Sequence, residues 1–486
     1  MAWGPPARAG RNLGGSTVDG VLELRCRQPT GEVRSTARVT QVALQFGLSR
    51  GQADRAPSDP IRVHLGPGRI TAFVGPSGSG KTTALSRIEA CYPNAHSVQR
   101  VSFVPGRSIV DSVLPAGTLG EALSILSACA LGEPRLWIRY HRELSEGEKF
   151  RARLARALGL HTGTGAAAPL LCDEFGTSLH RRAAKAIAFN LRKLVSRGGL
   201  NLVVATSNED ILGDLQPDTT VHLLGSGRHQ VIERKPTRRA ISFSRRLRIE
   251  PGGKRDYEQF AAMHYRDTDE LGFVDKIFVL REGLGGELLG IVVYSHGPLE
   301  LALRNRATQG RYVRNPGRLN RELRILRRLV IHPDVRGCGL GHRLVRETLP
   351  RVGTPYVECL AAMGAVNPVF EKAGMKRIGT CAQPADQARA LTELTRLEVD
   401  PQARDFVLQV CRRSRVRRIV ARFVYNWYRA TTGRGERRVA RQSPQVLAQT
   451  FRGLVGSRPV YYLWCRDGNR CSAAPRRGAG GLLNRG

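Results

Sequence analysis

The chain of 486 residues is too long for one ordinary hydrophobic core, and its length predicts two to four domains. With 41% hydrophobic residues it has the composition of a folded globular protein, which excludes an intrinsically disordered one. The formal net charge of +36 favours polyanionic partners, nucleic acid before anionic membrane surfaces. The alternative is general basicity from biased codon usage, because only nine of the 77 basic residues are lysine.

The ten cysteines are scattered and contain no CxxC pair, so they support neither a zinc site nor a disulfide framework. The first residues lack the apolar region of a signal peptide, and no run of 18 apolar residues occurs. These features predict a cytoplasmic protein without a membrane-spanning segment.

Apolar strand-like runs alternate with helical patterns from "RITAFV" to about Pro236, which predicts a parallel α/β sheet. We expect this first domain to occupy residues 40–235, after an N-terminal extension over residues 1–39. The basic, Gly/Pro-punctuated residues 236–255 are predicted to form a linker.

A phosphate-binding motif, G-x4-G-K-[ST], lies in the first domain between a strand-like and a helical run. Its glycines allow backbone N–H groups to surround phosphate oxygens at a helix N-terminus. Lys81 would neutralise the β- and γ-phosphates, and Thr82 would offer its hydroxyl to Mg²⁺. The predicted ATP-binding residues here are Gly75, Pro76, Ser77, Gly78, Ser79, Gly80, Lys81, Thr82 and Thr83.

The segment "APLLCDEFGTSLH" (168–180) is an apolar strand that ends in two acids. Asp173, at the strand end, is suited to bind Mg²⁺. Glu174 is suited to position or deprotonate the attacking water.

Between these motifs, Leu144-Ser-Glu-Gly-Glu148 is similar to the LSGGQ signature, and the order of motifs resembles an ABC-type ATPase. The resemblance implies a dimer in which Ser145 and Gly147 of one nucleotide domain contact the ATP of the other. It also implies that Phe46 stacks on adenine; the alternative is that Phe46 is a core residue.

Several family positions differ in this chain. No glutamine occurs in "VSFVPGRS" (101–108), Ser207 occupies the switch-histidine position, and His180 occupies the D-loop aspartate position. The helical subdomain before the signature is expected to be short. We therefore expect ATP binding with slow, switch-like hydrolysis, and transport is disfavoured.

A second mixed unit is predicted over residues 256–400, with a helix at 257–266, strands at 275–282 and 287–296, and then an R-x-x-G-x-G loop. This loop places backbone donors at a helix start but lacks the lysine and hydroxyl that hold Mg-triphosphate. The alternative is a purely structural turn.

This loop and the later "NPVFEKAGM" (367–375) resemble the GNAT acetyltransferase superfamily, and the whole chain resembles fused ABC-type ATPase and acetyltransferase proteins. The implied fold class is α/β: a P-loop ABC-type nucleotide-binding domain followed by a mixed-sheet GNAT domain. The implied acetyl-CoA-binding residues are Val330, Arg336, Gly337, Cys338, Gly339, Leu340, Gly341 and Asn367.

Acetyl transfer to an amine requires a base and donors for the tetrahedral oxyanion. The candidate bases are Glu358 first, then Glu322 and His332, although residues of these types are more often solvated or structural than catalytic. The acid tyrosine of many relatives has no clear match, because Phe370 lies in the corresponding helix.

Two basic segments are candidates for nucleic-acid contact: residues 303–328, with nine arginines, and residues 411–438, in which arginines alternate with aromatics. The alternative for the second is an amphipathic helix with its aromatics packed inward. It belongs to a predicted basic C-terminal region over residues 401–486.

Together these features predict an ATPase, dimeric through its nucleotide domains, that couples ATP and Mg²⁺ to acetyl-CoA-dependent N-acetyltransfer onto a nucleic acid or a nucleic-acid-associated acceptor. One alternative is a nucleic-acid clamp with a non-catalytic GNAT unit. Another is an ATP-regulated acetyltransferase of small molecules or proteins.

Overall fold

The computed structural model describes residues 15–18, 21–24, 35–47, 59–161, 168–225, 227–237, 240–261, 273–403, 405–432, 439, 441–456 and 458–466. Contacts divide the chain into two compact units. The first comprises residues 1–269, 279–291 and 330–341, and the second comprises residues 270–278, 292–329 and 342–486. Among the described helices, none combines the length and the apolar content needed to span a bilayer.

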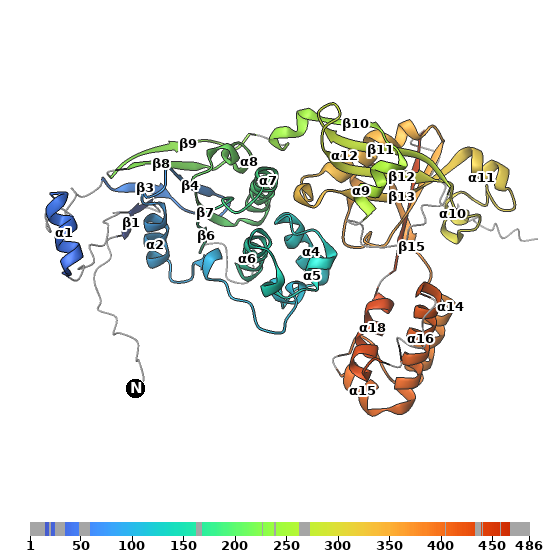
Figure 1. The fold of residues 1–486 in the computed structure, drawn as a ribbon. Coiled ribbons are helices and arrows are strands. Elements are labelled where there is room, and N and C mark those ends of the chain that lie inside the picture. The colour runs from blue at the N-terminus through green and yellow to red at the C-terminus, as the bar shows by residue number, and fades with distance from the viewer. Residues whose placement is uncertain are drawn as a thin grey trace, which may run out of the picture. The chain divides into compact units, whose positions relative to one another are not determined.

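A six-stranded sheet of order β5-β6-β7-β4-β8-β9 lies in the first unit (Figure 1). Its strands are parallel except for β9, which runs antiparallel to β8. Strands β4, β6 and β7 are buried along their whole length, as expected of parallel strands covered on both faces. The predicted parallel α/β sheet is therefore confirmed. The strands are β4 (Ile70–Val74), β5 (His96–Ser97), β6 (Pro169–Cys172), β7 (Asn201–Thr206), β8 (Thr219–Gly225) and β9 (Arg228–Glu233).

Helices of this unit follow the strands in the order expected of an α/β fold. The longest, α7, buries one face and is capped at its C-terminus by Gly199, whose φ of 65° lies in the left-handed region. Three short helices, α3 to α5, form the expected short helical subdomain before α6. The helices are α1 (Ala37–Gln45), α2 (Lys81–Cys91), α3 (Ile109–Val113), α4 (Leu119–Ala128), α5 (Pro134–Trp137), α6 (Glu146–His161), α7 (Arg181–Gly198), α8 (Leu212–Leu215) and α9 (Lys254–Ala261).

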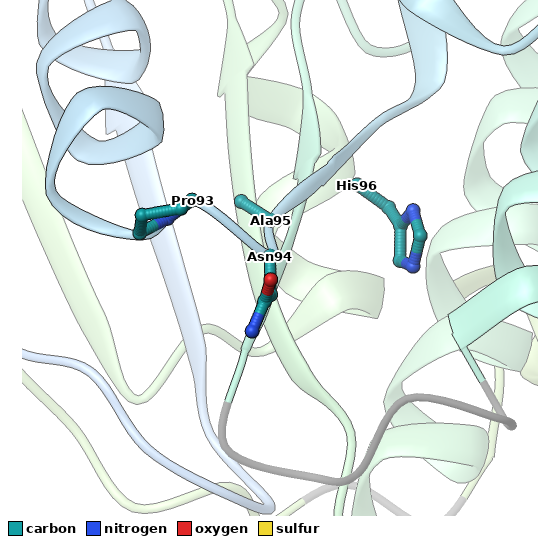
Figure 2. A pocket seen from close by; sticks show the side chains of 4 residues that line it. All are labelled: Pro93, Asn94, Ala95 and His96. Atoms are coloured by element: carbon teal, nitrogen blue, oxygen red, sulfur yellow. The ribbon is translucent and has the colours of Figure 1, made fainter.

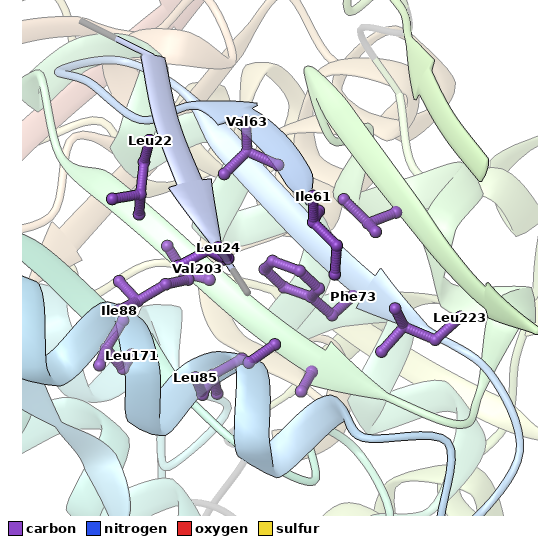
Figure 3. Packing of buried hydrophobic residues seen from close by; sticks show 13 residues of the cluster. Leu22, Leu24, Ile61, Val63, Phe73, Leu85, Ile88, Leu171, Val203 and Leu223 are labelled. Atoms are coloured by element: carbon purple, nitrogen blue, oxygen red, sulfur yellow. The ribbon is translucent and has the colours of Figure 1, made fainter. Parts of the chain in front are cut away.

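An antiparallel three-stranded sheet precedes the phosphate-binding motif, formed by β1 (Gly15–Val18), β2 (Val21–Leu24) and β3 (Ile61–His64). Leu22 and Leu24 of β2 pack with Phe73 of β4 and Ile88 of α2 in one buried cluster (Figure 3). The predicted boundary at residue 40 is therefore wrong, because strands within the supposed extension complete the core of the nucleotide-binding fold. Their short length, four residues each, left little periodicity to detect.

A seven-stranded mixed sheet has the order β10-β11-β12-β13-β14-β16-β15. Strand β13 pairs parallel with β14, and β16 pairs antiparallel with both β14 and β15. The strands are β10 (Leu247–Pro251), β11 (Val274–Glu282), β12 (Leu288–Ser295), β13 (Leu323–Ile331), β14 (Tyr356–Ala361), β15 (Lys376–Thr380) and β16 (Val460–Cys465). The associated helices are α10 (Ala302–Ala307), α11 (Pro316–Glu322), α12 (Leu340–Thr348) and α13 (Val369–Lys372).

Two predicted boundaries change as a result. The supposed linker 236–255 contains β10, and the supposed C-terminal region contributes β16 to the sheet. Residues 385–456, between β15 and β16, form what we call the helical insertion, drawn in orange to red in Figure 1. Its helices are α14 (Ala385–Thr395), α15 (Phe406–Arg412), α16 (Ser414–Thr432) and α18 (Pro444–Gly456). They share a hydrophobic core of their own, in which Phe406, Phe423 and Phe451 meet.

Candidate functional site

The phosphate-binding motif forms the predicted strand–loop–helix, from β4 through Gly75–Gly80 to α2. Gly75, Gly78 and Gly80 have φ values of 148°, 77° and 101°, which L side chains rarely adopt. A Cβ at Gly75 would lie 2.4 Å from the carbonyl oxygen of Leu223, so no side chain fits there. The loop therefore has the backbone shape that the motif predicts.

Lys81 crosses the mouth of this loop, where its Nζ donates to the carbonyl oxygens of Gly75 and Pro76 at 2.8 and 2.7 Å. Within the loop, the Oγ of Ser79 is buried without a hydrogen-bond partner among the described residues. Thr82 is exposed in the first turn of α2. A held cation and an unsatisfied hydroxyl beside a helix N-terminus fit the phosphates of ATP.

The paired acids lie at the end of β6. Strands β4 and β6 are both parallel to β7, so the motif after β4 and the acids after β6 lie at the same edge of the sheet. The amide of Glu174 donates to Asp173 Oδ1 at 2.9 Å, and Glu174 has a φ of 48°. The Glu174 side chain is exposed, and its uncommon backbone conformation is typical of functional sites.

Gln99, a residue that sequence reasoning missed, is held against Asp173. Its Nε2 donates to the carbonyl oxygen of Asp173 at 2.5 Å, and its Oε1 accepts from the Asp173 amide at 3.2 Å. Gln99 lies two residues before "VSFVPGRS", the segment that lacks a glutamine. In the sequence, the signal for this contact is a glutamine just outside that segment. Its partner, Asp173, becomes evident only from the pairing of β5 with β6.

Ser207 and His180 are the two other positions that differ from the family's residues. Ser207 is exposed after β7, and His180 is exposed at the start of α7, where its side chain makes no cap. Thr206 donates to the carbonyl oxygen of Phe175 at 2.8 Å, which ties the end of β7 to the segment after the acids.

The signature segment lies at the N-terminus of α6. The amide of exposed Ser145 donates to Glu148 at 2.8 Å. A Cβ at Gly147 would lie 3.1 Å from the carbonyl oxygen of Ser178. A larger residue at this position would therefore move the start of α6 away from the segment that precedes α7. Their contact with a second ATP stays a prediction.

Phe46 is 72% exposed and follows α1, a helix that buries none of its residues. The alternative that Phe46 is a core residue is therefore wrong. Its stacking on adenine stays a prediction.

A cavity of about 420 Å³ lies beside Pro93, Asn94, Ala95 and His96, between α2 and β5 (Figure 2). None of its lining residues belongs to the phosphate-binding motif. Among the described residues, its lining therefore does not overlap the candidate nucleotide site.

The R-x-x-G-x-G loop also forms the predicted strand–loop–helix, from β13 to α12. Gly337 and Gly339 have φ values of 83° and 84°. Arg336 is turned back into the protein: its Nε donates to the carbonyl oxygen of Ile331 at 2.8 Å, and its Nη1 donates to that of Gly132. Burial lowers the pKa of Arg336 and raises the pKa of the neighbouring Cys338 thiol to about 12.

Two side chains of α7 hold the carbonyl side of this loop within the first unit. Asn190 Nδ2 donates to the carbonyl oxygen of Arg336 at 3.1 Å, and Lys193 Nζ donates to that of Gly337 at 2.8 Å. Both hydrogen bonds are accepted by backbone carbonyl oxygens of the loop, whereas an anion would be bound by backbone N–H groups. The ligand of this loop stays a prediction. Of the other predicted contacts, Val330 is buried in β13, and Asn367 is exposed before α13.

Glu358 is fully buried in the second unit. Arg304 Nε donates to its Oε2 at 2.9 Å and Arg304 Nη2 to its Oε1 at 2.6 Å. The hydroxyl of Tyr461 donates to Oε2 at 2.8 Å. Both carboxylate oxygens are therefore engaged, which favours a structural role over that of a general base.

The other two candidate bases have unfavourable surroundings. Hydrogen bonds from Arg311, and to a lesser degree Arg318, lower the pKa of Glu322 to about 2, which makes it a weak proton acceptor. Burial lowers the pKa of His332, whose Nδ1 accepts from the Asp334 amide at 3.3 Å. A neutral His332 with Nδ1 as acceptor carries its proton on Nε2, so neither nitrogen is a free base.

Comparisons with known proteins give similarity to ATP-binding subunits of importers, and no protein-family model matches the chain. The aliphatic sulfonates import ATP-binding protein SsuB 2 of Streptomyces avermitilis is 36% identical over 140 residues, which are 25% of this chain and 56% of the relative. The methionine import ATP-binding protein MetN 2 of Salmonella choleraesuis is 25% identical over 36% of this chain and 60% of the relative. The zinc import ATP-binding protein ZnuC of Halorhodospira halophila is 30% identical over 35% of this chain and 71% of the relative. The chain thus spans a little over half of the first two relatives.

Among solved structures, a dimeric ATP-binding cassette in a post-hydrolysis state, bound to ADP and Pi, is 21% identical to this chain. The matched part makes up 36% of this chain and 89% of the chain in that structure. Its TM-score of 0.29 is too low to support a conclusion.

Proposed function

Because the chain belongs to the ABC-type ATPase family, through a nucleotide-binding domain of about a third of its length, we propose that it binds and hydrolyses ATP at residues 75–83. The observation that supports this most directly is the position of Lys81, whose Nζ is held across the glycine loop by two hydrogen bonds. This loop lies at the same edge of the sheet as Asp173, which follows β6.

Each residue of the proposed site has a defined task. Lys81 binds the β- and γ-phosphates, and the Thr82 hydroxyl and Asp173 hold Mg²⁺, which neutralises phosphate charge when bound. Glu174 orients the attacking water and accepts its proton. Gln99 fixes the backbone of Asp173 through two hydrogen bonds. Because Ser207 stands at the family's switch-histidine position and His180 at its D-loop aspartate position, we propose slow turnover suited to a switch.

We propose a homodimer through the nucleotide domains, in which Ser145 and Gly147 cap the ATP of the partner. Ser145 is exposed at the N-terminus of α6, where backbone N–H groups and the helix dipole favour an anion. The relatives' names describe importers. For this chain we propose a different use of ATP, because a second sheet and a helical insertion follow the nucleotide-binding domain.

We further propose that the second sheet binds acetyl-CoA at residues 336–341 and transfers the acetyl group to an amine on a nucleic acid or a nucleic-acid-associated acceptor. The support is the strand–loop–helix with positive φ at Gly337 and Gly339. A second candidate function, a nucleic-acid clamp whose GNAT unit is non-catalytic, is favoured by the engaged state of Glu358, Glu322 and His332.

One labelling experiment separates these functions. The protein is incubated with Mg-ATP, labelled acetyl-CoA and total cellular RNA, DNA, protein and small metabolites, and the label is followed into each fraction. Lys81→Ala is expected to abolish ATP hydrolysis and to reduce labelling. Lys185→Ala is the matched control, because this lysine of α7 pairs with Asp210 outside the nucleotide site.

Each outcome has a distinct meaning. Label in RNA, DNA or bound protein supports the proposed function, and label in small molecules supports an ATP-regulated acetyltransferase. ATP hydrolysis without any labelling supports the clamp. Labelling that Lys81→Ala leaves unchanged would rule out coupling between the two chemistries.

A further inference from the structure

The two basic segments of the second unit differ in how their charge is used. In residues 303–328, Arg304 pairs with Glu358, Arg311 and Arg318 pair with Glu322, and Arg324 pairs with Asp275. These four of the nine arginines serve the fold, which weakens the expectation that they form an acceptor surface. Exposed Arg306, Arg314, Arg321 and Arg327 form no ion pair among the described residues, but they are spread over α10, α11, β13 and the loop between the two helices.

The arginines of the helical insertion are arranged differently. Arg415, Arg418, Arg422 and Arg429 are exposed on α16, at spacings of three, four and seven residues. This spacing places them on one side of a helix, together with half-buried Tyr425. We call this set the arginine stripe. At 1.5 Å per residue it is about 21 Å long.

Little negative charge of the protein neutralises the stripe. Arg422 pairs with Glu393 of α14. In the described part of the chain, no ion pair is formed by Arg415, Arg418 or Arg429. Exposed Arg412 and Arg413 extend the charge at the end of α15, and the first turn of α16 contains no acid.

This arrangement is unfavourable for the isolated helix. Cations near a helix N-terminus oppose the helix dipole, and like charges at close spacing repel each other. The three arginines of the stripe that form no ion pair among the described residues, Arg415, Arg418 and Arg429, are instead suited to bind an anionic partner. Arginine is suited to phosphate, because its planar guanidinium donates two parallel hydrogen bonds.

The opposite face of α16 decides between nucleic acid and a membrane surface. Membrane-surface helices keep an apolar face free to enter the lipid. On α16 that face is occupied, since Val416, Val420 and Phe423 are buried in the core of the helical insertion. Trp427, near the end of α16, is 37% exposed. A charged face whose apolar counterpart is otherwise buried favours a phosphate backbone over a bilayer.

We infer that the arginine stripe binds nucleic acid through its phosphate backbone, with Arg415, Arg418 and Arg429 as the main contacts. The inference rests on the proposed function only for the class of partner, and it assigns that partner a surface. Because the contacts are to phosphates, binding is expected to be independent of base sequence and sensitive to salt.

The test compares two triple variants of equal charge. The first is Arg415→Gln/Arg418→Gln/Arg429→Gln. The control is Arg346→Gln/Arg377→Gln/Arg396→Gln, three exposed arginines of the second unit outside α15 and α16. Binding of labelled single-stranded RNA, single-stranded DNA and duplex DNA is measured by fluorescence anisotropy between 50 and 300 mM salt, values chosen around the range in which phosphate contacts are screened. Neither ATP nor acetyl-CoA is present.

For the stripe variant we expect affinity to fall by about tenfold or more, and the slope of log Kd against log salt to decrease by about 2 to 3. The control should bind like the unmodified protein, and both variants should keep its thermal unfolding midpoint. The relative affinities of the three probes identify the preferred nucleic acid.

Three results would overturn the inference: equal losses in both variants, which would indicate general basicity; no binding by the unmodified protein; or selective loss of binding to phosphatidylserine vesicles with nucleic-acid binding intact. Failure of acetyl transfer would leave this binding result unaffected, so the two proposals fail separately.

Discussion

Arg304 and Glu358 form an ion pair that is closed to solvent: both side chains have 0% exposure, and Arg304 Nη2 lies 2.6 Å from Glu358 Oε1. They come from α10 and β14, which are far apart in the sequence. Burial of a charge is tolerable only when its partner stays in place.

We therefore predict that Glu358→Leu lowers the free energy of unfolding by about 3–5 kcal/mol, because it leaves the Arg304 guanidinium buried and unpaired. The double variant Arg304→Met/Glu358→Leu should recover most of this loss, since both charges are then absent. Urea unfolding of Glu358→Leu, Arg304→Met and the double variant measures the coupling. A folded, fully stable Glu358→Leu protein without acetyl transfer would instead support catalysis by Glu358.

The Gln99–Asp173 contact gives a second prediction. Gln99→Ala removes both hydrogen bonds to the Asp173 backbone. We expect it to reduce ATP hydrolysis by on the order of tenfold and to weaken Mg²⁺ binding, because Asp173 is then less firmly positioned. Gln99→Glu should not restore activity, because a carboxylate cannot donate to the Asp173 carbonyl oxygen. Phosphate release at a series of Mg²⁺ concentrations measures both effects. Gln230→Ala, an exposed glutamine of β9, is the control. Equal rates for Gln99→Ala and this control would contradict a positioning role.

Gly337 provides a third prediction. An alanine there would have to adopt a φ of 83°, at a cost of about 1–2 kcal/mol, and its Cβ would lie 2.7 Å from Asn190 Nδ2. Gly337→Ala is therefore expected to distort the loop and to weaken acetyl-CoA binding, measured by calorimetry. Gly374→Ala is the matched control, because Gly374 has a φ of 93° but nothing within 4 Å of an added Cβ. A similar loss of affinity in both variants would show that general destabilisation explains it.

Acid should remove the contribution of Glu322. Its pKa in the folded protein is lowered to about 2 from an ordinary value of 4.5, mainly by the hydrogen bond from Arg311. A lowered folded pKa adds stability above the unfolded pKa, and that stability is lost as the pH falls from 4.5 towards 2. The difference in urea midpoint between the unmodified protein and Glu322→Gln should therefore be largest at pH 6 and should narrow as the pH approaches 3. A difference that stays constant over this range would show that the carboxylate charge contributes nothing.

The elements that follow from local patterns were predictable. The strand–loop–helix at Gly75–Lys81 and the one at Arg336–Gly341 both formed, because positive-φ glycines between an apolar run and a helical run leave few other conformations. The order of strands around Asp173 followed from the alternation of apolar runs and helices.

The parts that depend on distant pairing were not predictable. Gln99 gains its role only because β5 lies beside β6. The sequence around Phe370 offers no match to the acid tyrosine, whereas Tyr461 and Tyr462 lie in β16, which follows the helical insertion in the sequence. Tyr461 donates to Glu358, and Tyr462 donates to Glu371 at 2.9 Å. No local pattern states which strand fills a place in a sheet.

The position of β16 between β14 and β15 also determines when, during synthesis, the sheet can be completed. Strands β14 and β15 leave the ribosome first, and they cannot become neighbours through β16 until the whole helical insertion has been translated. Until then, the edges of β14 and β15 that pair with β16 stay open, and open strand edges are prone to wrong pairing. The hydrogen bond from the Tyr461 hydroxyl to Glu358 is also missing. The helical insertion, with its own hydrophobic core, can fold during that interval. A ribosome paused before Val460 would therefore hold a chain with a folded helical insertion and an unfinished sheet.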